Sequence, residues 1–105
     1  IRELVDAGIG LIITTGGTGL GRRDITPEVL DAMATRRVSG LAEMFRSESR
    51  HHTELAWLSR ADAVMIGQTL VIALPGSPKA VMQGMQIIGP LLSHARSMIA
   101  GGGHA

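Results

Sequence analysis

A glycine-rich run is the clearest candidate for binding chemistry in this sequence. Glycine lets the backbone approach an anion closely and adopt positive φ, so successive amide N–H groups can point at one phosphate. The run lacks the Lys-Ser/Thr pair of a Walker loop, and its glycines are spaced wrongly for a dinucleotide fingerprint. It is either a phosphate-binding loop or a flexible connection between a strand and a helix, and its residues are Thr15, Gly16, Gly17, Thr18 and Gly19.

Three charged residues follow this run directly. Arg22 and Arg23 could each clamp phosphate oxygens with two hydrogen bonds, or could form a solvated charged turn. Asp24 stands in a glycine-rich loop shortly before an expected helix. It could help to hold Mg²⁺, orient a reacting group or tether its own loop, and spacing alone does not decide among these roles.

A second loop of similar design lies near residue 76. In both places an apolar strand pattern leads into a loop that ends in a hydroxyl residue and a proline, Thr26-Pro27 and Ser77-Pro78. The hydroxyl can cap a helix and proline suits its first position. Because helix N-termini at the carboxyl ends of strands attract phosphate, the two loops could converge on one ligand. The second loop comprises Pro75, Gly76, Ser77 and Pro78.

Other polar residues carry weaker signals. His51-His52 invites a metal interpretation, but adjacent side chains point apart and no ligand set of suitable spacing accompanies them. Ser59-Arg60 has the pattern of an ordinary loop end before an apolar segment.

The positioning elements follow from apolar patterning. The apolar run 10–15 without polar alternation predicts a strand buried on both faces. Helices are predicted from Thr26 and from Pro78, with Pro90 as a kink in the latter. The strands 63–66 and 69–74 flank Gly67-Gln68 and predict a type II′ hairpin. Further expectations are a helix near the N-terminus, an inward stripe of Val29, Leu30 and Met33, a helix bearing Leu41, Met44 and Phe45, and a polar segment 47–59 anchored by Leu55, Trp57 and Leu58.

Composition bounds the class of protein. The 105 residues fit one domain, 1–105, with a flexible tail at 100–105. The formal net charge of +1 does not favour nucleic-acid binding. The absence of cysteine excludes disulfides, and no apolar run approaches the roughly 20 residues that span a bilayer.

Two ordered blocks of the sequence resemble the molybdopterin-binding MogA/MoaB family. The first block runs from Leu11 to Glu28, and the second covers 58–61 and 69–81 at the family's spacing. The resemblance implies an α/β fold with three α/β/α layers, whose mostly parallel sheet carries a β-hairpin. It also implies a homo-oligomer, a trimer or hexamer. The absence of cysteine is compatible with the expected cytoplasmic location. The family's amino-terminal portion has no counterpart in this sequence, which suggests a fragment.

The resemblance also implies a reaction. The family transfers the adenylyl group of Mg²⁺·ATP to the terminal phosphate of molybdopterin and releases pyrophosphate. By position, Asp24 matches the catalytic aspartate, and the loop from Gly16 to Gly19 would hold phosphate. Arg22 or Arg23, and Mg²⁺ held with help from Asp24, could neutralise the phosphate charge. Ser59, Arg60 and the loop Pro75, Gly76, Ser77 and Pro78 match the pterin pocket. Alternatives are a non-catalytic molybdopterin-binding or scaffold protein, a molybdenum insertase and a pyridine-nucleotide-processing relative.

Overall fold

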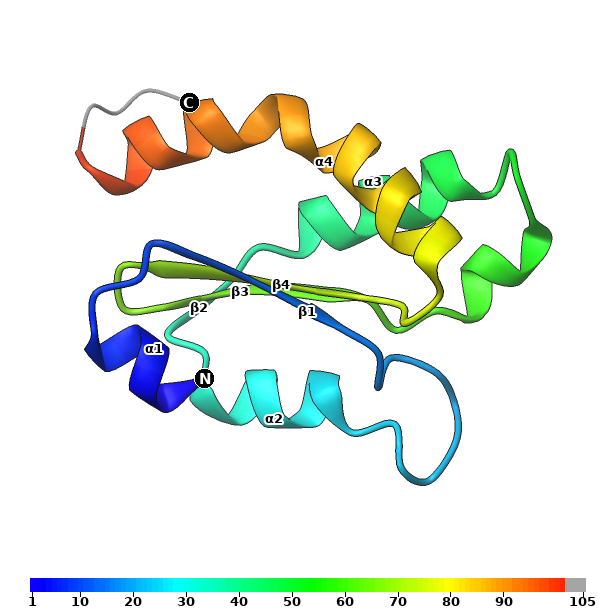
Figure 1. The fold of residues 1–105 in the computed structure, drawn as a ribbon, viewed down its shortest axis with the longest axis horizontal. Coiled ribbons are helices and arrows are strands. Elements are labelled where there is room, and N and C mark those ends of the chain that lie inside the picture. The colour runs from blue at the N-terminus through cyan, green and yellow to red at the C-terminus, as the bar shows by residue number, and fades with distance from the viewer. Residues whose placement is uncertain (102–105) are drawn as a thin grey trace.

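The computed structural model describes residues 1–101 and has three layers (Figure 1). Helices α1 (Arg2–Asp6) and α2 (Thr26–Met33) lie on one face of a sheet. Helices α3 (Ser39–Ser49) and α4 (Pro78–Ile99) cover the other face. The predicted α/β/α architecture is therefore confirmed.

The sheet has four strands, and its spatial order is β1-β4-β3-β2. Strand β1 (Leu11–Thr15) runs parallel to β4 (Thr69–Leu74). Strand β3 (Asp62–Ile66) pairs antiparallel with β4 and with the two-residue strand β2 (Arg36–Arg37). Within the described residues the sheet is thus mixed rather than mostly parallel, because the hairpin turns β3 back against β4.

The hairpin has the predicted turn. Gly67 has φ of 60°, and no non-glycine residue among those described has positive φ, so Gln68 does not. Positive φ at the first turn position only is the pattern of a type II′ turn, whose twist matches the flanking strands.

Burial differs sharply between the two parallel strands. All six residues of β4 are buried, because strands flank it on both sides and helices cover both faces. The prediction that segment 10–15 is buried on both faces is wrong for β1, where only Ile12 is buried. β1 forms an edge of the sheet in the described chain, so one side of it lacks a neighbour.

Each face of the sheet carries its own core. Phe45, Leu74 and Ile88 belong to the cluster under α3 and α4, and Leu30 and Val71 to the cluster over α2. Gly84 lets α4 approach the sheet closely, since a Cβ there would lie 2.8 Å from Leu74 Cδ1. Most predicted core positions are confirmed, but Val29 is 42% exposed.

The two proline-marked helices begin differently. Ser77 caps α4 as predicted, because its Oγ accepts a hydrogen bond from the Ala80 amide at 3.1 Å. The prediction that Thr26 caps α2 is wrong: Ile25 is the N-cap residue and makes no side-chain cap. The Thr26 hydroxyl instead donates to Gly16 O at 3.1 Å and ties the preceding loop to the helix. α4 continues through Pro90 to Ile99.

The polar segment after α3 ends in the short 3₁₀ helix η1 (Glu54–Leu58). The predicted anchors fail, since Leu55 is 70% exposed and Trp57 and Leu58 are also exposed. The small side chain of Ala56 is the buried contact, and Arg46 Nη1 fixes the following chain by donating to Ala61 O at 2.9 Å. Sequence hydrophobicity misleads here because η1 buries its small alanine and leaves its large apolar side chains exposed.

The structure describes only the first part of the predicted tail, at the C-terminal end of α4. Ala100 is the C-cap residue of α4 and its amide donates to Arg96 O, while residues 102–105 lie outside the described part of the chain. In residues 1–101, no helix has both the length and the apolarity needed to cross a membrane.

Candidate functional site

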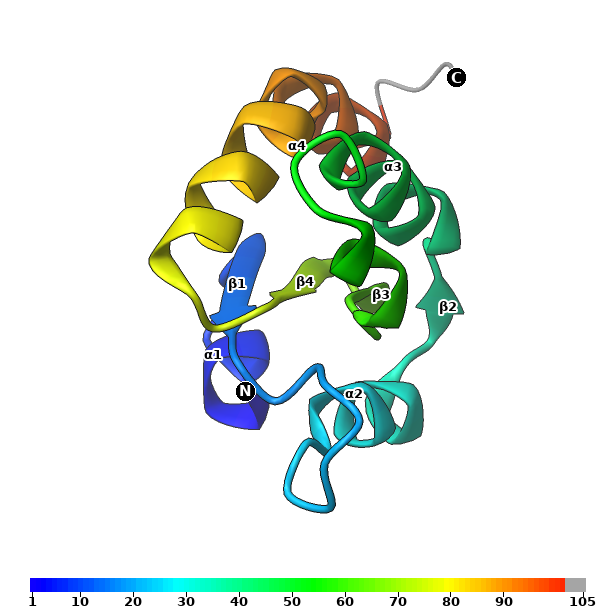
Figure 2. The same cartoon turned by 90° about the vertical axis from the view of Figure 1, so that its right-hand side faces the viewer.

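A cleft of about 690 Å³ opens at the carboxyl ends of β1 and β4. Figure 2 looks onto this end of the molecule, where the loop after β1, the start of α4 and the segment around η1 come together. The cleft is lined by Gly16, Gly17, Thr18, Gly19, Leu20, Asp24, Phe45, Ser49, Thr53, Leu55, Ala56, Leu58, Ser59, Pro75, Gly76, Ala80 and Gln83.

The two glycine-containing loops meet in this cleft, as the sequence predicted. A Cβ on Gly76 would lie 3.2 Å from Gly16 Cα, so the backbones touch where any side chain would crowd them. The Gly16 amide donates to Leu74 O at 2.8 Å and extends the β1–β4 pairing to the loop. The parallel pairing therefore delivers both loops to one place.

The glycine-rich loop is held in a conformation that requires glycine. Gly16 and Gly17 have φ of 95° and 75°, which side chains rarely tolerate. A Cβ on Gly17 would lie 2.1 Å from Thr26 Oγ1. The Thr26 amide also donates to Gly17 O at 3.1 Å, so this contact forms part of the loop's support.

The loop presents unpaired backbone donors. In the described chain, the amides of Gly17, Thr18, Gly19 and Leu20 have no hydrogen-bond acceptor. All four residues line the cleft, and Thr18 is 3% exposed. Consecutive unpaired amides beside a cavity form the kind of site that binds anionic oxygens.

The Asp24 carboxylate lies against the glycine-rich loop. Its Oδ2 accepts a hydrogen bond from the Gly21 amide at 2.9 Å, and a Cβ on Gly19 would lie 2.8 Å from that oxygen. No group of three or more His, Cys, Asp or Glu side chains in residues 1–101 could hold a metal ion. A single carboxylate still suits Mg²⁺ that arrives on nucleotide phosphates, because this ion commonly takes one or two protein carboxylates and retains water.

Arg60 supports the loop from the side of α2. Its backbone amide donates to Thr18 O at 2.7 Å, and its Nε donates to Gly19 O at 2.8 Å. Its two terminal nitrogens donate to Asp24 O and to the Glu28 carboxylate. The hydrogen bond from Arg60 lowers the pKa of Glu28, and the reciprocal contact raises the pKa of Arg60. Arg60 itself does not line the cleft.

The opposite half of the cleft is mainly apolar. It combines Phe45 with side chains of the η1 segment and includes Ser59, which the family resemblance had assigned to the pterin. Ser49 adds a hydroxyl that is buried and lacks a hydrogen-bond partner in the described chain. From the sequence, Ser59 alone of these residues was assigned to the site; the apolar Leu55 and Leu58 within a polar segment were the available signal for the rest, and they were misread as anchors.

The remaining predicted site residues lie near the cleft but do not line it. Arg22 and Arg23 are exposed on the outer part of the loop, and Thr15 is exposed at the end of β1. Ser77 and Pro78 form the start of α4. His51 and His52 are exposed in the turn after α3.

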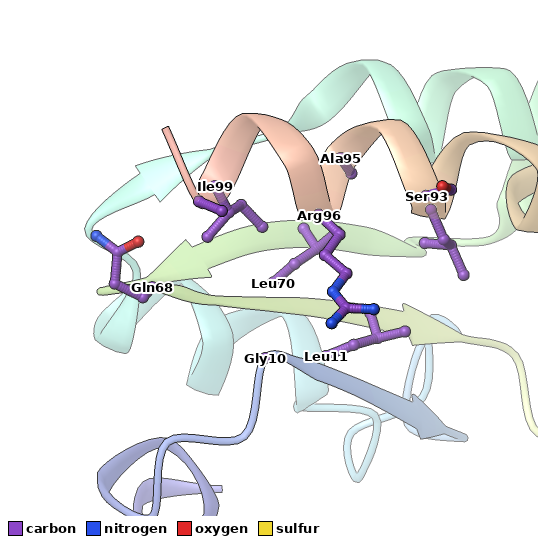
Figure 3. Close-up of a pocket in the computed structure, with 10 residues that line it drawn as sticks. Gly10, Leu11, Gln68, Leu70, Ser93, Ala95, Arg96 and Ile99 are labelled. Atoms are coloured by element: carbon purple, nitrogen blue, oxygen red, sulfur yellow. The ribbon is translucent and has the colours of Figure 1, made fainter. Parts of the chain in front are cut away.

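A second cavity, here called the groove, measures about 700 Å³ and lies at the opposite end of β1 (Figure 3). Arg96 reaches from α4 toward the start of β1 beside Leu11. The groove is lined by Gly10, Leu11, Gln68, Leu70, Leu92, Ser93, Ala95, Arg96, Ile99 and Ala100.

Sequence comparison relates the chain to proteins of molybdenum cofactor synthesis. A molybdenum cofactor biosynthesis bifunctional protein of Synechococcus elongatus is 41% identical over 104 residues, which are 99% of this chain and 33% of that protein. A molybdopterin adenylyltransferase of Escherichia coli K12 is 42% identical over 85 residues, which are 80% of this chain and 44% of that enzyme. The chain thus spans less than half the length of these curated relatives.

Solved structures share the fold. The molybdopterin biosynthesis enzyme MoaB of Thermus thermophilus superposes with a TM-score of 0.87 at 44% identity, covering 95% of this chain and 64% of that one. A MogA structure gives a TM-score of 0.90 at 38% identity, covering 93% and 65%. The family model described as a probable molybdopterin binding domain matches residues 1–94. Because that model covers residues 1–94 of 105, the chain belongs to the family of probable molybdopterin-binding domains.

Proposed function

We propose that this chain acts in molybdenum cofactor biosynthesis and contributes the phosphate-holding part of a molybdopterin adenylyltransferase site. The observation that carries the proposal is the row of four unpaired amides, Gly17 to Leu20, beside Asp24 in the cleft. Relatives at about 40% identity bear the name molybdopterin adenylyltransferase, which supplies the substrate class.

The proposed reaction places little demand on acid–base chemistry. An oxygen of the pterin's terminal phosphate attacks the α-phosphorus of ATP. The bond from that phosphorus to the bridging oxygen breaks, and pyrophosphate departs with the electron pair. Because a phosphate monoester is already anionic near neutral pH, catalysis depends on alignment and charge neutralisation.

Different residues of the cleft provide the alignment and the charge neutralisation. The amides of Gly17 to Leu20 bind phosphate oxygens, and the meeting of Gly16 with Gly76 brings the second loop to the same ligand. Asp24 would help to hold the Mg²⁺ that arrives with the nucleotide, through the carboxylate that the Gly21 amide already fixes. The apolar half around Phe45, with Ser59, accepts the heterocycle. Assembly as a trimer or hexamer and a cytoplasmic location stay predictions.

The test is molybdopterin-dependent release of pyrophosphate from Mg²⁺·ATP. We expect Asp24→Asn to lower the rate by about 10²–10³-fold, the usual effect of removing one electrostatic group from an active site. Asp6→Asn is the matched control, since Asp6 lies on α1 and pairs with Arg2 at 3.8 Å.

The alternatives give different results in the same assay. Molybdopterin binding without pyrophosphate release would support a non-catalytic pterin-binding protein. Unchanged turnover in Asp24→Asn would remove Asp24 from the catalytic role while leaving the binding role of the amides open to direct titration with pyrophosphate.

A further inference from the structure

The four unpaired amides are matched by four anchored carbonyl groups. Gly16 O accepts from the Thr26 hydroxyl at 3.1 Å, and Gly17 O from the Thr26 amide at 3.1 Å. Thr18 O accepts from the Arg60 amide at 2.7 Å, and Gly19 O from Arg60 Nε at 2.8 Å. Every peptide plane from Gly16 to Leu20 is therefore held by its oxygen.

The geometry of the peptide bond fixes the direction in which each amide of the anchored loop points. The described chain has no cis peptide bond, and in a trans peptide the N–H points opposite to the C=O of the same plane. Carbonyls held by Thr26 and Arg60 thus direct the amides of Gly17 to Leu20 away from those two residues. Thr26 holds the first two planes, the backbone amide of residue 60 holds the third, and the Arg60 side chain holds the fourth.

We propose that Arg60 is a positioning residue that keeps the second half of the glycine-rich loop open to phosphate, rather than a residue that contacts the pterin. Its guanidinium also binds Asp24 O, so it fixes the loop on both sides of the turn that carries the Asp24 carboxylate. This inference rests on the proposed function only for the identity of the ligand.

The contacts explain why arginine is required. Nε and the two terminal nitrogens form a planar fork that serves Gly19 O, Asp24 O and Glu28 at once. Lysine has one ammonium group and cannot satisfy these separate acceptors in fixed directions. Glu28 on α2 supplies the countercharge that orients the fork, and its own side chain is 57% exposed.

The first measurement needs no ligand. Hydrogen exchange of the Asp24 and Thr26 amides reports on the loop, because they donate to Gly21 O and Gly17 O. In Arg60→Met and Arg60→Lys we expect the Asp24 amide to exchange at least tenfold faster, while the Thr26 amide, which holds the first half of the loop, and the Val71 amide in the buried strand β4 are unchanged. Titration with inorganic pyrophosphate should show at least tenfold weaker binding in both variants.

Arg37→Met is the matched control. Arg37 pairs with Asp31 on α2 at 2.9 Å, as Arg60 pairs with Glu28, but within residues 1–101 it makes no hydrogen bond to the loop. We expect this variant to retain wild-type loop exchange and pyrophosphate affinity.

Other outcomes would overturn the proposal. If the Arg60 variants kept normal loop exchange and pyrophosphate affinity but lost affinity for molybdopterin, Arg60 would be a direct pterin contact. If the wild-type protein bound no pyrophosphate, the proposed function would be wrong. The hydrogen-exchange data would still test whether Arg60 positions the loop. Should Arg60→Met lose its folded circular dichroism spectrum, Arg60→Lys and Glu28→Gln carry the exchange comparison, and normal exchange in both would contradict the proposal.

Discussion

The two cavities have nearly the same volume, about 690 Å³ for the cleft and 700 Å³ for the groove, yet they are lined by different chemical groups. The cleft is formed where two loops meet, and it exposes unpaired backbone amides. The groove is formed by side chains at the start of β1, in the hairpin turn and at the end of α4 (Figure 3). Volume alone does not distinguish a binding site; the supply of fixed hydrogen-bond donors does.

In the part of the chain that the structure describes, buried oxygens without a hydrogen-bond partner gather at the cleft end of the molecule. The buried oxygens without a partner in the described chain belong to Thr14 near the end of β1, Ser49 beside the cleft and Asp62 at the start of β3. Among residues 1–101, none that lines the groove has such an oxygen. Functional regions commonly carry local features that cost stability, and the rest of the fold offsets them.

The largest expected effect is that of substituting Gly17 in the cleft, and it is compared with the same substitution of Gly10 in the groove. Gly17→Ala places a Cβ against Thr26 at positive φ, and we expect it to cost about 1–3 kcal/mol of unfolding free energy. It should also abolish measurable pyrophosphate binding, because relief of the clash displaces the loop from Thr26. Urea denaturation and titration with pyrophosphate measure the two effects.

Gly10→Ala is the matched change in the groove. Gly10 does not have positive φ, and a Cβ there meets no heavy atom within 4 Å. We expect unchanged pyrophosphate binding and a gain of about 0.4–1 kcal/mol through the unfolded state. Equal loss of binding in Gly10→Ala and Gly17→Ala would abolish the distinction between cleft and groove.

A smaller effect concerns Asp62, whose pKa is raised by burial and next by the Asp31 carboxyl, with Arg37 opposing the shift. A raised folded-state pKa means that its contribution to stability is present below the unfolded value of 3.8 and is lost as pH rises through the folded value. Asp62→Asn should therefore stabilise the protein at pH 7, by on the order of 0.5 kcal/mol after allowance for solvent screening. Urea denaturation at pH 7 and pH 3 checks this.

The control for that experiment is Asp6→Asn, an exposed carboxylate on α1. We expect no difference in stability from wild type at either pH. A gain in Asp62→Asn that persisted unchanged at pH 3 would mean that the buried negative charge is not its source.

The smallest expected effect lies in the groove. Arg96 is the cationic residue of the groove lining and lies beside the start of β1 (Figure 3). If positive charge alone made an anion site, Arg96→Gln would weaken pyrophosphate binding. We expect less than a twofold change in the dissociation constant, because the described part of the groove is built from side chains rather than from a row of unpaired amides. A tenfold loss would show that the groove is a second anion site.

Local sequence signals predicted several features of both regions. The glycine-rich loop, the second loop at Pro75 to Pro78, the Ser77 cap and the hairpin at Gly67 all follow from the φ preferences or hydrogen-bonding capacity of a few neighbouring residues. The convergence of the two loops also followed from sequence, because parallel strands end at the same edge of a sheet.

Only the tertiary structure determined the contacts of residues whose partners are distant in sequence. Thr26 has the pattern of a helix cap, yet its hydroxyl binds Gly16 O ten positions earlier. Arg60 lies 41 positions from Gly19 and has the pattern of an ordinary loop end, but the β3–β4 hairpin brings it to the back of the loop. The sequence determined that a loop of this kind exists, because glycine conformation is local. The fold decided which way its amides point, because each carbonyl takes its partner from whichever element packs beside it.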